Sequence, residues 1–143
     1  MYNPKISYTP ILDHNAILSQ CQGDLSSKIL IISDVSEDNK ENAQLQINIF
    51  KSIDYNYPQD FLVLNITKTT YFKLIDLLES TQIDFVMTFG VPLSHFGLQH
   101  ELKDFEHLKI RDVTLIKSTS FKALQENKSH KAALWGTLKT VFK

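Results

Sequence analysis

The feature that most constrains the fold is an uninterrupted apolar run near the start of the chain. Residues 28–33 contain four consecutive branched apolar side chains, Ile29, Leu30, Ile31 and Ile32. Because successive side chains of a strand point to opposite faces, a strand without polar alternation is covered on both faces, as in a parallel sheet. Comparable runs at residues 61–66, 83–89 and 113–116 predict three further buried strands.

Between and after these strands, apolar residues recur at the three- and four-residue spacing of a helix. The clearest case is a helix over residues 40–53, with its apolar side chains at Ala43, Ile47, Phe50 and Ile53. Thr69-Thr70 can cap a second helix, and shorter helical pieces are predicted over residues 13–21 and 91–97. Ser129 is predicted to cap the last helix, whose apolar positions are Ala132, Leu134, Trp135, Leu138, Val141 and Phe142.

The alternation of strands and helices predicts right-handed crossovers and a three-layer α/β fold. We expect a four-stranded parallel sheet with helices on both faces, formed by residues 28–143. Residues 98–112 are mixed and mostly polar and contribute no predicted strand. Residues 1–27 are polar and irregular, and we interpret them as an N-terminal segment outside this single domain.

Composition excludes several classes of protein. The chain has 143 residues, enough for one domain, and no stretch reaches the ~20 apolar residues that a membrane span needs. Residues 1–5 lack the basic flank and apolar core of a secretory signal, and the single cysteine, Cys21, excludes an internal disulfide. We therefore expect a cytoplasmic protein without a membrane anchor.

Charge is unevenly distributed along the chain. Residues 109–143 hold eight Lys or Arg and two acids, whereas residues 1–108 hold seven Lys or Arg and fourteen acids. A basic C-terminal quarter could face an acidic partner or a phosphate backbone. Alternatively, the two regions neutralise each other on the folded surface.

The loops after the strands carry no complete catalytic motif. In parallel sheets, ligands bind beyond the carboxyl ends of the strands, here residues 34–39, 65–68, 89–94 and 117–120. The four glycines form neither a dinucleotide nor a phosphate-binding loop, and the third strand ends without the aspartate of a receiver domain. No serine nucleophile elbow is present, and we expect no cofactor and no metal site from the scattered histidines His14, His95, His100, His107 and His130.

The order of elements from residue 28 resembles the uracil-DNA glycosylase fold. A first strand leads into the acidic loop 34–38, the second ends in Asn65, the third ends in Phe89-Gly90, and the last leads to a serine-containing turn. Active members carry Gly and Pro in the first loop and a His-Pro-Ser element in the last turn, which here reads Ser118-Thr119-Ser120. The resemblance implies a degraded active site without enzymatic activity, with a vestigial pocket formed by Asp34, Asn39, Asn65, Phe89, Ser118 and Ser120.

Within this fold, residues 118–135 are similar to the end of the psi subunit family of the bacterial DNA polymerase III clamp-loader complex. A serine turn, an apolar pair, an Asn and a basic residue precede Ala132-Ala133-Leu134-Trp135. The resemblance implies a non-catalytic adaptor for protein partners in a clamp-loader-like complex. Psi proteins dock through an N-terminal Trp with neighbouring arginines, but this chain has no Trp before Trp135 and no Arg before Arg111. Docking by the N-terminal segment would therefore use Tyr2, Ile6, Tyr8, Ile11 and Leu12.

Two alternatives remain open at the level of sequence. The first is a divergent glycosylase-like protein in which Asn65 hydrogen-bonds a flipped base, Phe89 stacks on it, and the basic C-terminal quarter makes weak DNA contacts. The second is an unrelated small Rossmann-like domain that binds another ligand. The sequence also leaves open whether Trp135 belongs to the core or to a contact surface.

Overall fold

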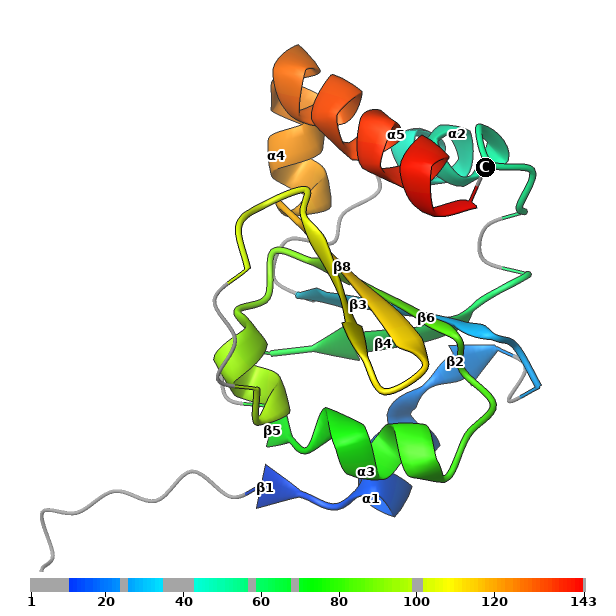
Figure 1. The fold of residues 1–143 in the computed structure, drawn as a ribbon, viewed down its shortest axis with the longest axis vertical. Helices are drawn as coiled ribbons and strands as arrows, with labels where there is room; N and C mark the ends of the chain where they lie inside the picture. Colours follow the sequence, from blue (N-terminus) through cyan, green and yellow to red (C-terminus); the bar gives the residue numbers. More distant parts are fainter. Residues whose placement is uncertain are drawn as a thin grey trace, which may run out of the picture.

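The sheet has six strands, although only four of them have the continuous apolar character of buried strands (Figure 1). The computed structural model describes residues 11–23, 26–34, 43–56, 59–67, 70–98 and 102–142. The strands lie in the order β2-β4-β3-β6-β8-β7. Their bounds are β2 Gln22–Gly23, β3 Ile29–Asp34, β4 Leu62–Ile66, β6 Phe85–Phe89, β7 His107–Ile110 and β8 Val113–Ser118.

The four predicted strands form the parallel centre of the sheet, β4-β3-β6-β8. The α/β class agrees with the prediction, but the prediction of a purely parallel four-stranded sheet is wrong, because β2 and β7 add antiparallel edges. β7 and β8 form a hairpin across Arg111-Asp112, where Arg111 has a left-handed φ of 57° and pairs with Glu79 at 2.5 Å. The mostly polar segment 98–112 therefore contains a strand that its composition did not indicate.

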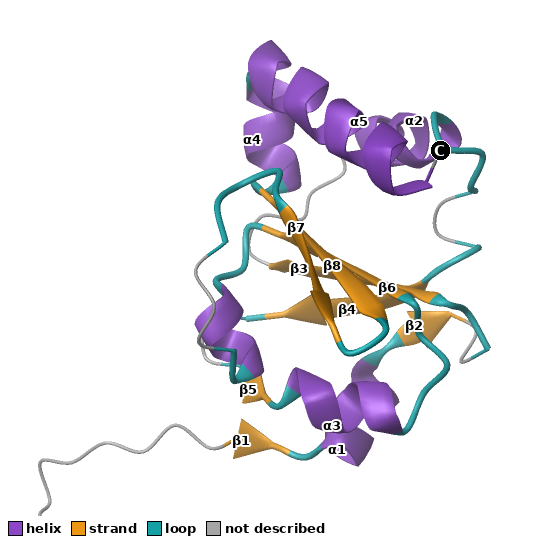
Figure 2. Ribbon diagram, viewed as in Figure 1, coloured by secondary structure: helices purple, strands orange, loops and turns teal. Residues whose placement is uncertain are grey.

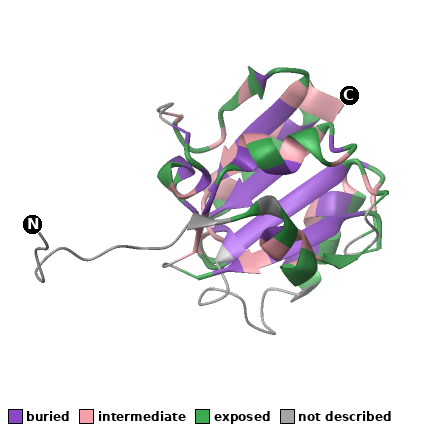
Figure 3. Cartoon of the chain, turned by 90° about the horizontal axis from the view of Figure 1, so that it is seen from below, coloured by how far each residue is buried: buried purple, intermediate pink, exposed green. Residues whose placement is uncertain are grey.

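Two hydrophobic cores lie on opposite faces of the sheet, which explains the continuous apolar run in β3. Leu30 and Ile32 belong to one core, and Ile29 and Ile31 belong to the other. The first core is covered by α1 (His14–Gln20), α3 (Leu74–Glu79) and the 3-10 helix η3 (Leu93–Phe96), and the second by α2 (Ala43–Lys51), α4 (Phe121–Glu126) and α5 (Lys128–Phe142). Figure 2 shows the two helical layers on either side of the sheet, and Figure 3 shows that the strands of the sheet are largely buried.

Residues 11–23 are part of the domain rather than a separate segment. β1 (Ile11–Leu12) pairs in parallel with β5 (Tyr71–Phe72), and β2 pairs with β4. Between them, Ile17 on α1 is fully buried in the first core. The predicted boundary after residue 27 therefore falls inside the folded unit. Of the residues proposed to dock on a partner, Tyr2, Ile6 and Tyr8 lie outside the described residues.

The C-terminal helical region consists of two helices where one was predicted. Ser120 caps α4 by accepting a hydrogen bond from the Ala123 amide at 3.1 Å. α5 begins after Asn127, whose Oδ1 accepts from the amide and hydroxyl of Ser129 at 3.0 and 2.6 Å. The predicted cap, Ser129, is thus itself a donor to Asn127. None of the described helices is long and apolar enough to cross a membrane.

Candidate functional site

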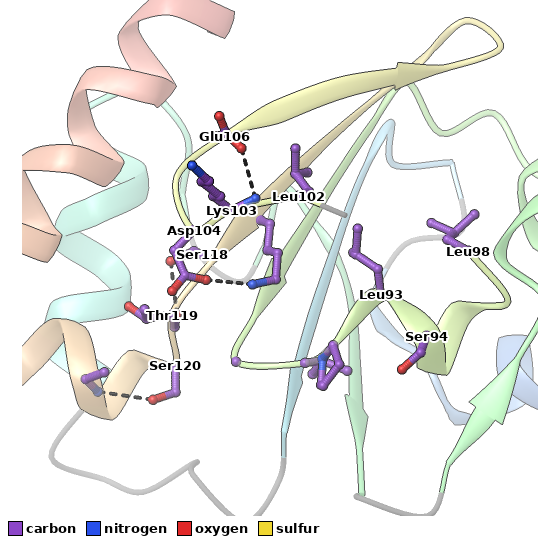
Figure 4. Close-up of a pocket in the computed structure, with 15 residues that line it drawn as sticks. Leu93, Ser94, Leu98, Leu102, Lys103, Asp104, Glu106, Ser118, Thr119 and Ser120 are labelled. Carbon is purple, nitrogen blue, oxygen red and sulfur yellow. Dashed lines mark hydrogen bonds and ion pairs between the residues drawn. The ribbon is translucent and has the colours of Figure 1, made fainter. Parts of the chain in front are cut away.

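An open cleft of about 920 Å³ lies at the carboxyl ends of β6 and β8 (Figure 4). The parallel strands run in the order second, first, third, fourth, and ligands of such sheets bind beyond the carboxyl ends of the strands. Leu93 and Leu98 supply apolar side chains from the segment after β6, and Leu102 adds another beside Lys103. A polar wall comes from the end of β8 and the segment before β7, with Lys103, Asp104, Glu106, Lys117, Ser118, Thr119 and Ser120.

The polar wall carries two lysines and two acids, and one ion pair joins two of them. The Lys117 Nζ lies 2.7 Å from Asp104 Oδ1, and the Glu106 Oε1 accepts a hydrogen bond from the Lys103 amide at 2.9 Å. The side chain of Lys117 is 23% exposed, and that of Asp104 is 44% exposed, so solvent screens this ion pair substantially. The cleft therefore presents a nearly neutral polar wall rather than a concentrated charge.

The turn Ser118-Thr119-Ser120 is tightly packed against Gly90. Gly90 has a φ of +75°, and a Cβ on it would lie 2.8 Å from Ser120 Cβ, so a side chain is excluded there. Its amide donates to the Ser118 carbonyl at 3.0 Å. The Ser118 hydroxyl, in a residue only 2% exposed, donates to the Thr119 carbonyl at 3.0 Å. The Ser118 and Ser120 hydroxyls thus both have structural partners within the turn and the cap of α4.

Thr119 provides the one polar group of this turn whose hydrogen bonding is incomplete. Its Oγ1 is buried and has no partner among the described residues, and the same holds for Thr88 Oγ1 on β6. Buried hydroxyls usually have a partner, so these two atoms mark positions where a water or a ligand atom would be favourable. Thr119 lines the cleft, whereas Thr88 does not.

The strand register brings together three of the six residues predicted to form the vestigial pocket, Asn65, Phe89 and Ser118, in one row with Ser33. Ser33 pairs with Asn65 on β4 and with Phe89 on β6, and Phe89 pairs with Ser118 on β8. These residues form one row across the central strands. The Ser33 hydroxyl donates to Asn65 Oδ1 at 2.7 Å, which ties the first two strands together. Asn65 does not line the cleft at the ends of β6 and β8.

Phe89 does not project into the cleft. It is 1% exposed in the core beneath α4, where its ring stacks on Phe121 with centroids 4.1 Å apart and an interplanar angle of 17°. Phe50 meets it edge-on at 6.1 Å. The stacking position that the sequence assigned to a flipped base is therefore occupied by Phe121. Asp34 ends β3 beside Ile66, and Asn39 lies outside the described residues.

No protein-family model matches the chain, and no curated protein matches it by sequence.

The sequence contains five histidines, which are common metal ligands. In the part of the chain that the structure describes, no group of three or more His, Cys, Asp or Glu side chains could hold an ion. His95 instead stacks on Tyr71 with centroids 4.3 Å apart, and its Nδ1 lies 3.0 Å from the Thr70 carbonyl. Burial raises the pKa of the Cys21 thiol to about 11.

A second candidate surface lies on α5, away from the cleft. The sequence left open whether Trp135 belongs to the core or to a contact surface, and the structure leaves 48% of this residue exposed, whereas Leu134 and Leu138 are buried. The Lys139 Nζ lies 4.2 Å from the centroid of the Trp135 ring, a cation–π contact. The sequence does not distinguish Trp135 from its buried neighbours, because Trp135 lies at the edge of the helix face that contains Leu134 and Leu138.

Proposed function

We propose that this chain is a non-catalytic adaptor, resembling the psi accessory subunit of the bacterial replicative clamp-loader complex. It would act in the cytoplasm and join protein components of a DNA replication machine. The observation that carries the proposal is the exposure of Trp135, the last residue of the psi-like segment 118–135. A large aromatic side chain that is half-exposed on a long helix is typical of an interface anchor.

The strand-end turn supports the non-catalytic part of the proposal. Active glycosylases carry a His-Pro-Ser element where this chain has Ser118-Thr119-Ser120. Both serine hydroxyls are engaged locally, and Lys117 is paired with Asp104. A general base needs hydrogen-bond reach to the proton that it removes, and these groups already have other partners.

Co-purification from the native cell tests the proposal directly. The tagged full chain, recovered at low salt, should bring clamp-loader subunits with it. A variant lacking residues 1–10 then tests whether the N-terminus makes the contact. Residues 11–23 are kept in this variant because they pair and pack within the domain. Recovery of the protein alone, under conditions that keep a known clamp-loader complex intact, would contradict the adaptor proposal.

The cleft favours one second candidate, a ligand-binding Rossmann-like domain. Its volume lies within the range of small-molecule sites, and its lining combines apolar and polar groups. The glycosylase-like alternative has less support, because Phe121 already covers Phe89. Thermal denaturation in the presence of small ligands and of uracil-containing oligonucleotides separates these alternatives. A higher melting temperature with a small ligand would favour the Rossmann-like domain, and one with the oligonucleotides would favour the glycosylase-like protein.

A further inference from the structure

The exposed side of α5 carries lysines in register with Trp135. Lys131 and Lys139 lie four residues before and after Trp135, and Lys128 lies seven residues before it. At 3.6 residues per turn, these spacings place all four side chains along one side of the helix. We call this set, Lys128, Lys131, Trp135 and Lys139, the α5 stripe.

Positive charge exceeds negative charge along the two C-terminal helices. Residues 121–142 hold four lysines, and Glu126 is the one acid among them. The ion pairs within the described residues are Lys28–Asp84, Arg111–Glu79 and Lys117–Asp104, so none of them involves a lysine of the α5 stripe. The stripe therefore presents net positive charge to the solvent.

The helix surface next to Trp135 is open at Gly136. Gly136 follows Trp135, and a Cβ built on it would meet nothing within 4 Å. Glycine in the middle of an exposed helix is less favourable than alanine, and no neighbouring group explains it here. Ala132, one turn before Gly136, is also exposed. A partner can thus approach the helix closely next to the indole ring.

We propose that the α5 stripe docks an acidic protein surface, with Trp135 as the apolar anchor and the three lysines facing partner carboxylates. This inference rests on the proposed adaptor function and names the surface and the partner chemistry. Charge complementarity selects an acidic partner. Single-stranded nucleic acid would also satisfy the lysines, but such sites combine a groove with several aromatic platforms. Here the surface is a helix, and the other exposed large apolar side chain in the described part is aliphatic, Ile47.

Site-specific photocrosslinking in the native cell locates the contact. A benzophenone amino acid replaces the exposed Ala132 in the full-length chain, which leaves Trp135 in place, and the matched control carries it at Ile47, which is 42% exposed on α2. The expected result is a protein crosslink from position 132 and a much weaker one from position 47. A crosslink to nucleic acid, or no crosslink at position 132, would overturn the inference.

Affinity measurements with the partner that crosslinking identifies, purified separately, test whether an apolar anchor and positive charge bind it. Trp135→Ala should weaken binding by about 30-fold or more, as expected for an interface anchor, and Trp135→Phe should recover part of the loss. The triple variant K128Q/K131Q/K139Q should lose about 10-fold in affinity at low salt and approach the wild type as salt screens the charges. The control K51Q/K73Q/K109Q changes net charge equally with exposed lysines outside α5 and outside the cleft, and it should bind like the wild type.

The outcomes separate this inference from the proposed function. If tagged protein recovers partners but Trp135→Ala and K128Q/K131Q/K139Q bind them normally, docking occurs elsewhere and only the α5 inference is overturned. Equal losses in the two lysine triples would show a non-specific charge effect and would also overturn it. If no protein is recovered and none crosslinks, both the adaptor function and the docking surface are contradicted.

Discussion

Replacement of Phe89 and of Trp135 by alanine should have very different effects on stability, because one ring is enclosed and the other is half in solvent. Phe89 is 1% exposed and stacks on Phe121 at 4.1 Å. Phe89→Ala removes the transfer free energy of the ring and leaves a cavity, a loss of about 3–5 kcal/mol from the free energy of unfolding. That is a large fraction of the ~5–15 kcal/mol that stabilises a typical domain.

Trp135→Ala should cost much less. With 48% of Trp135 exposed, about 100 Å² of a large aromatic side chain remains in contact with the protein. At ~25 cal/mol per Å², this area corresponds to roughly 2.5 kcal/mol. Alanine keeps part of that burial and is the better helix former by roughly half a kcal/mol, so the net loss is about 1–2 kcal/mol. No enclosed cavity forms, because the ring already faces the solvent.

Urea unfolding followed by far-ultraviolet circular dichroism measures both variants without relying on the indole signal. With an m value near ~2 kcal/mol/M, the midpoint should fall by about 1.5–2.5 M for Phe89→Ala and by about 0.5–1 M for Trp135→Ala. Phe89→Leu is the matched control and should lose less than about 1.5 kcal/mol, because it conserves most of the volume. Equal shifts for the two alanine variants would show that Trp135 is a core residue and would refute the reasoning.

Three further predictions test local features of the fold. Gly90→Ala should destabilise the domain by more than about 1 kcal/mol in the same urea assay, because its φ is +75° and its Cβ would contact Ser120. Asn127→Ala should lower the free energy of unfolding by about 1–2 kcal/mol, because it removes the cap of α5, and Ser129→Ala should lower it clearly less. A larger loss for Ser129→Ala would show that Ser129 is the cap. At pH 8, Cys21 should react with iodoacetamide about a hundredfold more slowly in the native protein than in urea, because burial raises its pKa from 9.0 to about 11. Since the folded state keeps this proton after the unfolded state has lost it, the contribution of Cys21 to stability should decline as pH rises from about 9 to about 11.

The centre of the sheet was predictable because its signal is unambiguous. Ile29 to Ile32 face two separate cores alternately, and such double burial requires an uninterrupted apolar run. The edges lack this signal. β1, β2 and β5 have two residues each, too few for any periodicity. β7 alternates over only four residues, from His107 to Ile110, and its turn Arg111-Asp112 lacks the glycine that usually marks a hairpin.

The candidate site was predictable in position but not in detail. Strand order alone places Asn65, Phe89 and Ser118 at one edge of a parallel sheet, and the register puts them in one row. The contacts of these side chains depend on elements that are distant in the sequence. Phe121 covers Phe89 because Ser120 starts a separate helix there, and a serine turn followed by an apolar pair does not distinguish that helix from a loop. Likewise, Lys117 and Asp104 meet only because the β7–β8 hairpin forms.

The chain has a single tryptophan, and its position on α5 determines what fluorescence can report. The indole ring is half in water in the folded state and fully in water in the unfolded state, so unfolding changes its surroundings little. The rings of the two cores, by contrast, belong to phenylalanine residues such as Phe50, Phe72 and Phe89, which contribute little to emission excited near the indole band. Tryptophan emission from this chain is therefore a weak reporter of folding and a direct reporter of anything that covers α5.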